Sequence, residues 1–78
     1  MIDMIRNRFE ELRLRKSREE GEKLPLKKIG KKTGLSETTL WRLSNGTNTR
    51  IDYATLDVLC RYFGCSICEL LEYVKDED

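Results

Sequence analysis

The chain has 78 residues, of which 38% are hydrophobic and 37% charged, and it contains no histidine. A chain of this length buries only about 60% of the surface that its unfolded form exposes, so it can form one compact core but no deep, walled enzyme pocket. The absence of histidine also removes the commonest general base and the commonest metal ligand. We therefore expect a single domain over residues 1–78 that is not an enzyme and holds no cofactor or metal.

The positive and negative charges separate along the chain. Residues 1–50 hold 13 Lys and Arg against 7 Asp and Glu, a net charge of +6, whereas residues 51–78 hold 2 against 7, a net charge of −5. The basic part suits a polyanion, and the chain closes with an acidic tail over residues 75–78. No stretch has the pattern of a signal peptide or a membrane span, so we expect a cytoplasmic protein with no membrane partner.

The spacing of apolar residues predicts an all-α fold of five helices, with no strand pattern and no internal repeat. A first helix is expected from residue 2 until it frays in the polar stretch 17–23, because one face carries Ile2, Ile5, Phe9 and Leu12. A second helix is expected over about residues 25–32. Pro25 suits its first turn, and Gly34 should end it in a left-handed conformation.

Three more helices are expected in the second half of the chain. Ser36 can cap a helix that runs through Ser44 with Leu40 and Leu43 on its buried side. After a polar turn over residues 45–50, Asp52 can cap a fourth helix and Ser66 a short fifth one. In these last two helices the residues expected to face inward are Leu56, Leu59, Cys60, Phe63, Ile67, Leu70 and Leu71.

The segment from about residue 25 to residue 45 carries the most information about function. Two short helices joined by a tight turn can cross steeply only if the first has a small residue at the crossing and the chain turns sharply between them. Gly30 meets the first requirement and Gly34 the second. The sequence therefore predicts a helix-turn-helix motif whose outward side chains are Glu37, Thr38, Trp41 and Arg42.

Residues 24–71 resemble the phage-repressor and Cro-type helix-turn-helix family, also called the xenobiotic-response-element family. The positions that carry the resemblance are Gly30, Gly34, Leu35, Leu40, Leu43, Asn45 and Gly46. The resemblance implies a compact, lambda-repressor-like DNA-binding domain. It also implies a sequence-specific transcriptional regulator of double-stranded DNA, a repressor that acts by occupying an operator.

The resemblance further implies that Glu37, Thr38 and Arg42 contact bases, and their chemistry permits it. Arg42 can donate two hydrogen bonds to guanine, Glu37 can accept one from cytosine, and Thr38 can bond a base edge or pack on a thymine methyl. Contacts to the DNA backbone, which fix register without reading sequence, are expected from Lys27, Lys31, Asn45, Thr47, Asn48 and Arg50. Thr39 and Trp41 are candidates for contact with DNA or with a partner.

Two other functions stay open at this stage. A helix-turn-helix domain can bind protein instead of DNA, as an antitoxin or accessory factor would, and the salt dependence of binding separates these cases. Cys60, Cys65 and Cys68 could form a metal or redox sensor, but they lack the fourth ligand of a zinc or iron–sulfur site. Core packing is the simpler interpretation of these thiols.

We expect a homodimer, at least on DNA, because one reading helix specifies only a few base pairs among very many competing sites. The acidic second part of the chain should face away from the phosphates. The dimer surface is then expected in residues 45–51, in the fourth helix or at Tyr73 and Val74, with the N-terminal Met1, Ile2 and Met4 as a rival surface.

Overall fold

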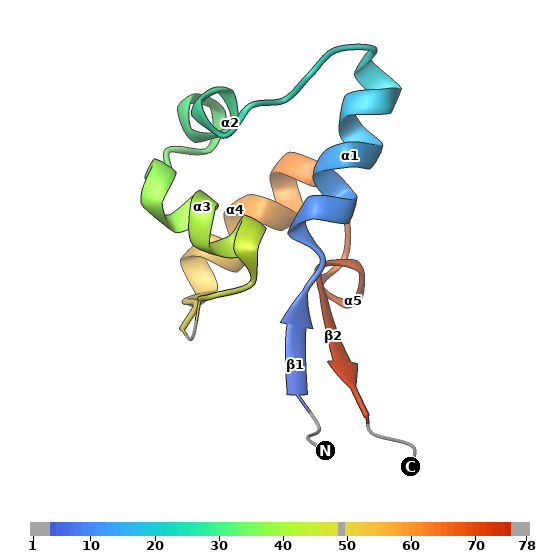
Figure 1. Ribbon diagram of the computed structural model, residues 1–78, viewed down its shortest axis with the longest axis vertical. Coiled ribbons are helices and arrows are strands. Elements are labelled where there is room, and N and C mark those ends of the chain that lie inside the picture. The colour runs from blue at the N-terminus through green and yellow to red at the C-terminus, as the bar shows by residue number, and fades with distance from the viewer. Residues whose placement is uncertain (1–3, 49, 76–78) are drawn as a thin grey trace.

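The computed structural model describes residues 4–48 and 50–75. Within them the chain forms five helices and a two-stranded sheet (Figure 1). In chain order the elements are β1 (Met4–Asn7), α1 (Phe9–Glu20), α2 (Leu26–Thr33), α3 (Glu37–Asn45), α4 (Tyr53–Phe63), α5 (Ile67–Leu70) and β2 (Leu71–Val74). The fold is mostly helical, as predicted, but the expectation of an all-α fold without strands is wrong.

Local capping signals set the helix ends at or close to the predicted residues. Ser36 Oγ accepts a hydrogen bond from the Thr39 N–H at 3.1 Å and begins α3. Asp52 begins α4 in the same way, and Ser66 begins α5 through a reciprocal capping box with Glu69. α2 begins at Leu26, one residue later than predicted, so Pro25 stands at the N-cap position instead of in the first turn.

The sheet joins the two ends of the described chain. β1 and β2 run antiparallel, with Met4 opposite Val74 and Asn7 opposite Leu71. The placement of Ile5 in a first helix and of Leu71 in the last helix is therefore wrong. The four-residue spacing between Ile5 and Phe9 fits a helix, but hydrogen bonds to a segment far along the chain hold residues 4–7 extended. Met1, Ile2 and residues 76–78, which were assigned to the rival dimer surface, the first helix and the acidic tail, lie outside the described residues.

Two smaller expectations also need correction. α1 continues to Glu20 and ends at Gly21, so the polar stretch that was expected to fray is helical over its first four residues. Ile67 points outward with 46% of its surface exposed. It is the first residue of the short helix α5, whereas Leu70, at the other end, is buried in the core as predicted.

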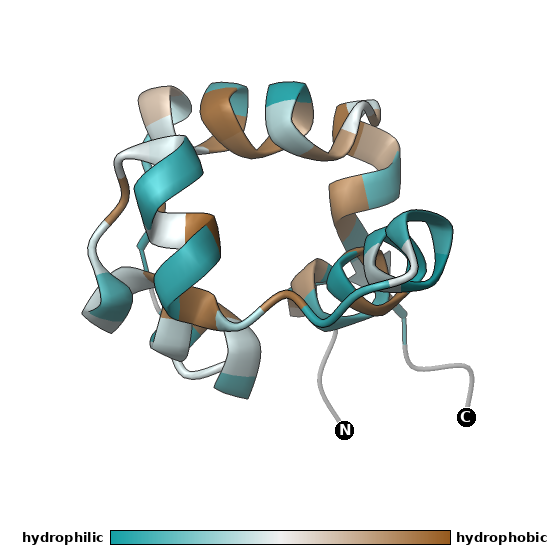
Figure 2. Ribbon diagram, turned by 90° about the horizontal axis from the view of Figure 1, so that it is seen from above, coloured by the Kyte–Doolittle hydropathy of each residue, from teal (hydrophilic) through white to brown (hydrophobic). Residues whose placement is uncertain are grey.

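The helices surround one hydrophobic core (Figure 2). Phe9 of α1 meets Phe63 of α4 edge to face, with ring centroids 5.7 Å apart. The buried core residues are Phe9, Leu12, Leu24, Ile29, Leu40, Leu43, Leu59 and Leu70. Because α2 and α3 both contribute to this core, the rest of the chain fixes the orientation of the helix pair.

The crossing of α2 and α3 depends on Gly30. A Cβ atom at this position would lie 3.0 Å from the carbonyl oxygen of Leu35 and 3.6 Å from Cδ1 of Leu40. Between the two helices, Gly34 has a φ of 79°, the left-handed conformation that glycine adopts at little cost. The two glycines have the roles that the sequence predicts for them.

The Gly30→Val variant should lower the free energy of unfolding by about 1–3 kcal/mol, because the added side chain overpacks the crossing. Its Cβ would meet a backbone oxygen, which cannot move aside as a flexible side chain could. Lys32→Val is the matched control, since Lys32 lies exposed on the same helix. Urea denaturation followed by circular dichroism measures both variants. Equal losses of stability would contradict a special role for the crossing.

Candidate nucleic-acid interface

α3 is fixed by contacts on its inner side. Leu40 and Leu43 are buried in the core. At the C-terminal end of the helix, the hydroxyl of Ser44 donates a hydrogen bond to Oε2 of Glu10 in α1, at 2.7 Å. These contacts hold the middle and the C-terminal end of the helix, so its outer face is presented in one orientation.

The outer face of α3 carries the residues that the sequence predicts for DNA contact. Glu37, Thr38, Trp41, Arg42 and Asn45 are all exposed. Trp41 has 59% of its surface exposed, so the rest of the chain leaves most of this large side chain uncovered. The structure therefore brings the three predicted base-reading residues onto one accessible helix face together with Trp41 and Asn45.

Thr39 differs from its neighbours on α3. It is half-buried, its N–H bonds the Ser36 side chain, and its hydroxyl accepts a hydrogen bond from the Ser36 hydroxyl at 2.9 Å. Its first role in the structure is thus to complete the cap that begins the helix.

The loop after α3 is folded back onto the helix. The backbone N–H of Thr47 bonds the carbonyl of Arg42 at 3.0 Å, which closes the helix as a Schellman-type end. Thr47 and Arg50 are exposed. Asn48 is half-buried, and its Oδ1 accepts a hydrogen bond from Nδ2 of Asn7 at 3.2 Å. The side-chain oxygen of Asn48 is therefore engaged within the chain.

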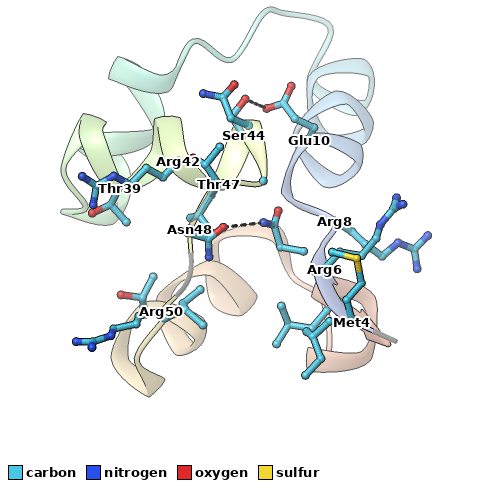
Figure 3. Close-up of a pocket in the computed structure, with 18 of the residues that line it drawn as sticks. Met4, Arg6, Arg8, Glu10, Thr39, Arg42, Ser44, Thr47, Asn48 and Arg50 are labelled. Carbon is cyan, nitrogen blue, oxygen red and sulfur yellow. Dashed lines mark hydrogen bonds between the residues drawn. The ribbon is translucent and has the colours of Figure 1, made fainter. Parts of the chain in front are cut away.

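An open groove of about 1330 Å³ lies between this loop and β1 (Figure 3). Thr39 and Arg42 from α3 and Thr47 and Arg50 from the loop line one side of it, and residues of β1 line the other. The groove thus adjoins the outer face of α3 and connects it with the sheet.

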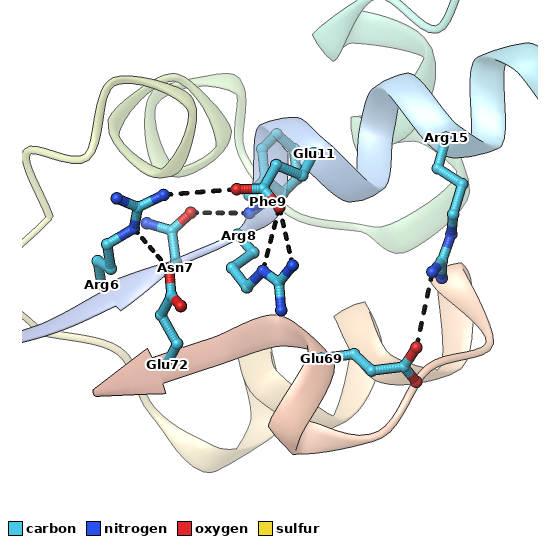
Figure 4. Close-up of polar contacts among 8 residues, drawn as sticks. All are labelled: Arg6, Asn7, Arg8, Phe9, Glu11, Arg15, Glu69 and Glu72. Atoms are coloured by element: carbon cyan, nitrogen blue, oxygen red, sulfur yellow. Dashed lines mark hydrogen bonds and ion pairs between the residues drawn. The ribbon is translucent and has the colours of Figure 1, made fainter. Parts of the chain in front are cut away.

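Carboxylates neutralise the basic side chains of β1 and α1 (Figure 4). Arg6 contacts Glu72 of the neighbouring strand at 2.9 Å, and Arg8 contacts Glu11 at 3.0 Å. Hydrogen bonding to Glu11, together with its charge, raises the pKa of Arg8. The further ion pairs on α1 are Arg13 with Glu10, Arg15 with Glu69 and Lys16 with Glu20.

The cations of the helix-turn-helix are mostly uncompensated. Lys28 pairs with Glu22, but no carboxylate in the described part of the chain forms an ion pair with Lys27, Lys31, Lys32, Arg42 or Arg50. Lys27, Lys31 and Arg42 are exposed. Within residues 4–48 and 50–75, Arg18, Lys23 and Lys75 also form no ion pair with a carboxylate. The concentration of unpaired cations on α2, α3 and the following loop makes this face attractive to a polyanion.

Sequence reasoning did not identify Asn7 and Glu10 as residues that shape this interface. Asn7 bonds the loop through its amide and the Phe9 N–H through its Oδ1, at 3.0 Å, while Glu10 anchors Ser44. Their partners Asn48 and Ser44 are 41 and 34 residues away in sequence. Neither periodicity nor a local motif contains a signal for contacts of this range.

The arrangement of α2, α3 and the unpaired cations agrees with a comparison against known protein families. The model of the Cro/C1-type HTH DNA-binding domain matches residues 22–76, more than half of the chain. The chain belongs to this family. It is therefore a DNA-binding domain of the class that regulates transcription, as its resemblance to the Cro-type family predicts. Searches of curated proteins and of solved structures gave no match.

The thiols of this Cro/C1-type domain differ in exposure. Cys60 and Cys65 are half-buried and pack against the core, whereas Cys68 is exposed. Burial, followed by the effect of neighbouring Cys60, raises the pKa of the Cys65 thiol, which lowers its content of reactive thiolate. In the described residues no group of three Cys, Asp or Glu side chains is placed to hold a metal ion. These observations favour the packing interpretation for Cys60 and Cys65.

No helix formed by residues 4–48 or 50–75 of the Cro/C1-type domain is long and apolar enough to cross a membrane.

The Asp52 cap at the loop end of the interface makes stability depend on pH. Hydrogen bonds from the side chain and the backbone N–H of Thr55 hold the pKa of Asp52 below its usual value. The stabilisation is therefore present above the unfolded-state pKa, about 4, and is lost as the pH falls through the lower folded-state pKa.

In Asp52→Asn the amide oxygen keeps an acceptor for the cap but does not titrate. The wild type should therefore lose more stability than this variant between about pH 5 and pH 3. Thermal unfolding of both proteins at several pH values measures the difference, and the other carboxylates are common to both. Parallel pH profiles would contradict the lowered pKa of Asp52.

Proposed function

We propose that the chain is a sequence-specific regulator of double-stranded DNA that represses transcription by occupying an operator, as a two-fold dimer on inverted half-sites. A bound protein denies the same stretch of DNA to the transcription machinery, so occupancy alone is sufficient for repression. Membership of the Cro/C1-type family supports DNA binding as the common activity.

The observation that carries the proposal is the charge pattern around the helix-turn-helix. The cations of β1 and α1 are largely paired with carboxylates, while those of α2, α3 and the loop are largely unpaired. A phosphate backbone would replace the missing counter-charges and release its own condensed cations. A surface used only for protein contact has no comparable requirement for one sign of charge.

Base reading is assigned to Arg42, Thr38 and Glu37. The exposed guanidinium of Arg42 has no internal carboxylate partner among the described residues, so its donors are available to O6 and N7 of guanine. Thr38 is exposed on the same face and suits a base edge or a thymine methyl. Glu37 stands at the start of α3, where its carboxylate can accept from N4 of cytosine.

Backbone contacts are assigned to residues on both sides of α3. Lys27 and Lys31 on α2 and Arg50 in the loop supply charge, and Asn45, Thr47 and Asn48 supply hydrogen-bonding groups. In Asn48 the donor is the side-chain NH₂, since its oxygen is bonded to Asn7. Such contacts position the protein on the duplex and contribute affinity on any sequence.

The dimer follows from the size of the reading surface. Three base-reading side chains on one short helix distinguish only a few base pairs, which is too few for selectivity in a genome. Two copies related by a two-fold axis read two half-sites about 34–36 Å apart and so double the recognised sequence.

Arg42→Ala should weaken binding to the preferred duplex by about 1–3 kcal/mol and relax selectivity at one base pair, because a bidentate base contact is lost. Lys27→Ala is the matched control for charge. It should weaken binding to all duplexes alike and reduce the slope of log K against log salt concentration by about 1. The preferred duplex is obtained by selection from a random pool. Quantitative mobility shifts then compare it with an unrelated duplex across a salt series.

Equal losses on the selected and the unrelated duplex for Arg42→Ala would show that Arg42 does not read a base. Binding that is insensitive to salt, or a selection that recovers no common sequence, would contradict the proposed function and favour a protein-binding role.

Trp41 should report the contact directly, because it is the one tryptophan of the sequence and stands exposed among the base-reading residues. Adding the selected duplex should change its fluorescence intensity as sugars and bases displace water from the ring. The anisotropy of a labelled duplex gives the saturation point in the same titration. Unchanged emission at saturation would mean that this face of α3 does not meet DNA.

A further inference from the structure

The sheet exposes much of the apolar surface in the described part of the chain. Ile5, Tyr73 and Met4 have 66%, 60% and 52% of their surfaces exposed. The sheet projects from the helices at the end of the molecule where both termini lie (Figure 1). Two strands alone are marginally stable in water, and a further strand or packing against a helix stabilises them. The exposed apolar side chains of this sheet therefore leave surface that a further strand could cover.

β1 keeps one edge open. The N–H of Arg8 bonds the carbonyl of Leu70 at 2.7 Å. Because hydrogen-bonded and non-bonded pairs alternate along an antiparallel ladder, the observed register directs the backbone groups of Met4 and Arg6 toward β2 and those of Ile5 and Asn7 away from it. No third strand formed by residues 4–48 or 50–75 covers that edge.

The space beside the open edge is sufficient for another strand. β1 forms one wall of the groove of about 1330 Å³, and a neighbouring strand needs a separation of about 4.8 Å. Arg42 and Arg50 on the opposite wall place this space next to the assigned DNA-contacting face.

We propose that β1 of one chain pairs antiparallel with β1 of a second copy, which joins the two sheets into one four-stranded sheet with the strand order β2-β1-β1-β2. The proposal rests on the proposed function in one respect, because it names the surface that forms the dimer. β1 precedes the residues that the family model matches, and its partner β2 lies within them.

A second copy fits this edge because an antiparallel pair of identical strands has two-fold symmetry and is self-complementary. The register that places Ile5 opposite Ile5 of the second copy lets the outward backbone groups of both residues bond each other. Moving the axis by one residue would set Arg6 opposite Arg6, and like charges directly opposite are destabilising. In the favoured register the two-fold axis passes at Ile5.

This interface also constrains DNA reading. The groove connects β1 with α3 through the Asn7–Asn48 hydrogen bond and the lining residues Thr39 and Arg42. A fixed pairing of the two β1 strands therefore fixes the separation and the relative orientation of the two α3 helices.

A charge exchange at Ile5 tests the interface and its register. Ile5→Lys and Ile5→Glu each place like charges opposite one another in the homodimer, and each should raise the dimer dissociation constant at least about tenfold. An equimolar mixture of the two variants should restore association to within about threefold of the wild type, because opposite charges then meet. Sedimentation velocity over a concentration series measures all three, and circular dichroism verifies that the exposed substitutions leave the fold intact.

Tyr73→Lys and Tyr73→Glu are the matched controls. Tyr73 is the cross-strand neighbour of Ile5 and is similarly exposed, but it lies on β2, away from the proposed axis. These variants should keep the dissociation constant within about threefold of the wild type. The proposal would be overturned if the Tyr73 variants, and not the Ile5 variants, lost association singly and regained it when mixed. A wild-type chain that stays monomeric at about 1 mM would also overturn it.

DNA binding is measured separately, on a duplex of about 30 base pairs, which holds two half-sites one turn apart. If the Ile5 variants show the loss and rescue of association but the wild type does not bind this duplex, the interface is supported and the proposed function is contradicted. If the wild type binds the duplex but the Ile5 variants show no loss and rescue, the interface alone is overturned.

Discussion

The close approach of two backbones at Gly30 is the constraint on which the presentation of α3 depends. The carbonyl oxygen of Leu35 occupies the place where the side chain of another residue would begin. This lets the turn between α2 and α3 pass directly across the first helix, with Ile29 and Leu40 buried on either side. Because the inner sides of both helices are used in this way, Glu37, Thr38 and Arg42 of α3 lie on the outer face.

Carboxylates determine which cations remain available to a polyanion. The net charge of the chain is only +1, so a uniform distribution would provide little attraction. Five carboxylates instead pair with the cations of β1 and α1 or with Arg8 between them, namely Glu10, Glu11, Glu20, Glu69 and Glu72. The carboxylates thereby leave α2, α3 and the loop as a locally positive face, which acts over about one Debye length, roughly 8 Å at physiological ionic strength.

Features encoded by neighbouring residues could be predicted from the sequence, and features that depend on distant pairing could not. Ser36, Asp52 and Ser66 begin their helices as predicted, because a cap is made within three or four residues. The glycines of the helix-turn-helix were recognisable for the same reason.

The sequence contains no comparable local signal for the sheet. β1 is only four residues long and largely exposed, so it lacks the alternation of a half-buried strand. Its apolar residue Ile5 also has helical spacing to Phe9 and Leu12, whereas its actual partner lies near the other end of the chain. For the site, the outer face of α3 was predictable from periodicity. The ties through Asn7 and Glu10 were not, because their partners are set only by the tertiary fold.

The pairing of the first described strand with the last has a consequence for synthesis on the ribosome. β1 emerges early, but its partner β2 follows every other described element in the chain. The helices can collapse onto Phe9 and Leu40 as they appear, since chains fold from the N-terminal side during translation. Residues 4–7 cannot form β1 before β2 has been synthesised, because an isolated strand has no inter-strand hydrogen bonds to hold it extended. A nascent chain that stops before residue 71 therefore carries a helix-turn-helix without an ordered sheet, and the strand edge exists only once the whole described segment has been translated.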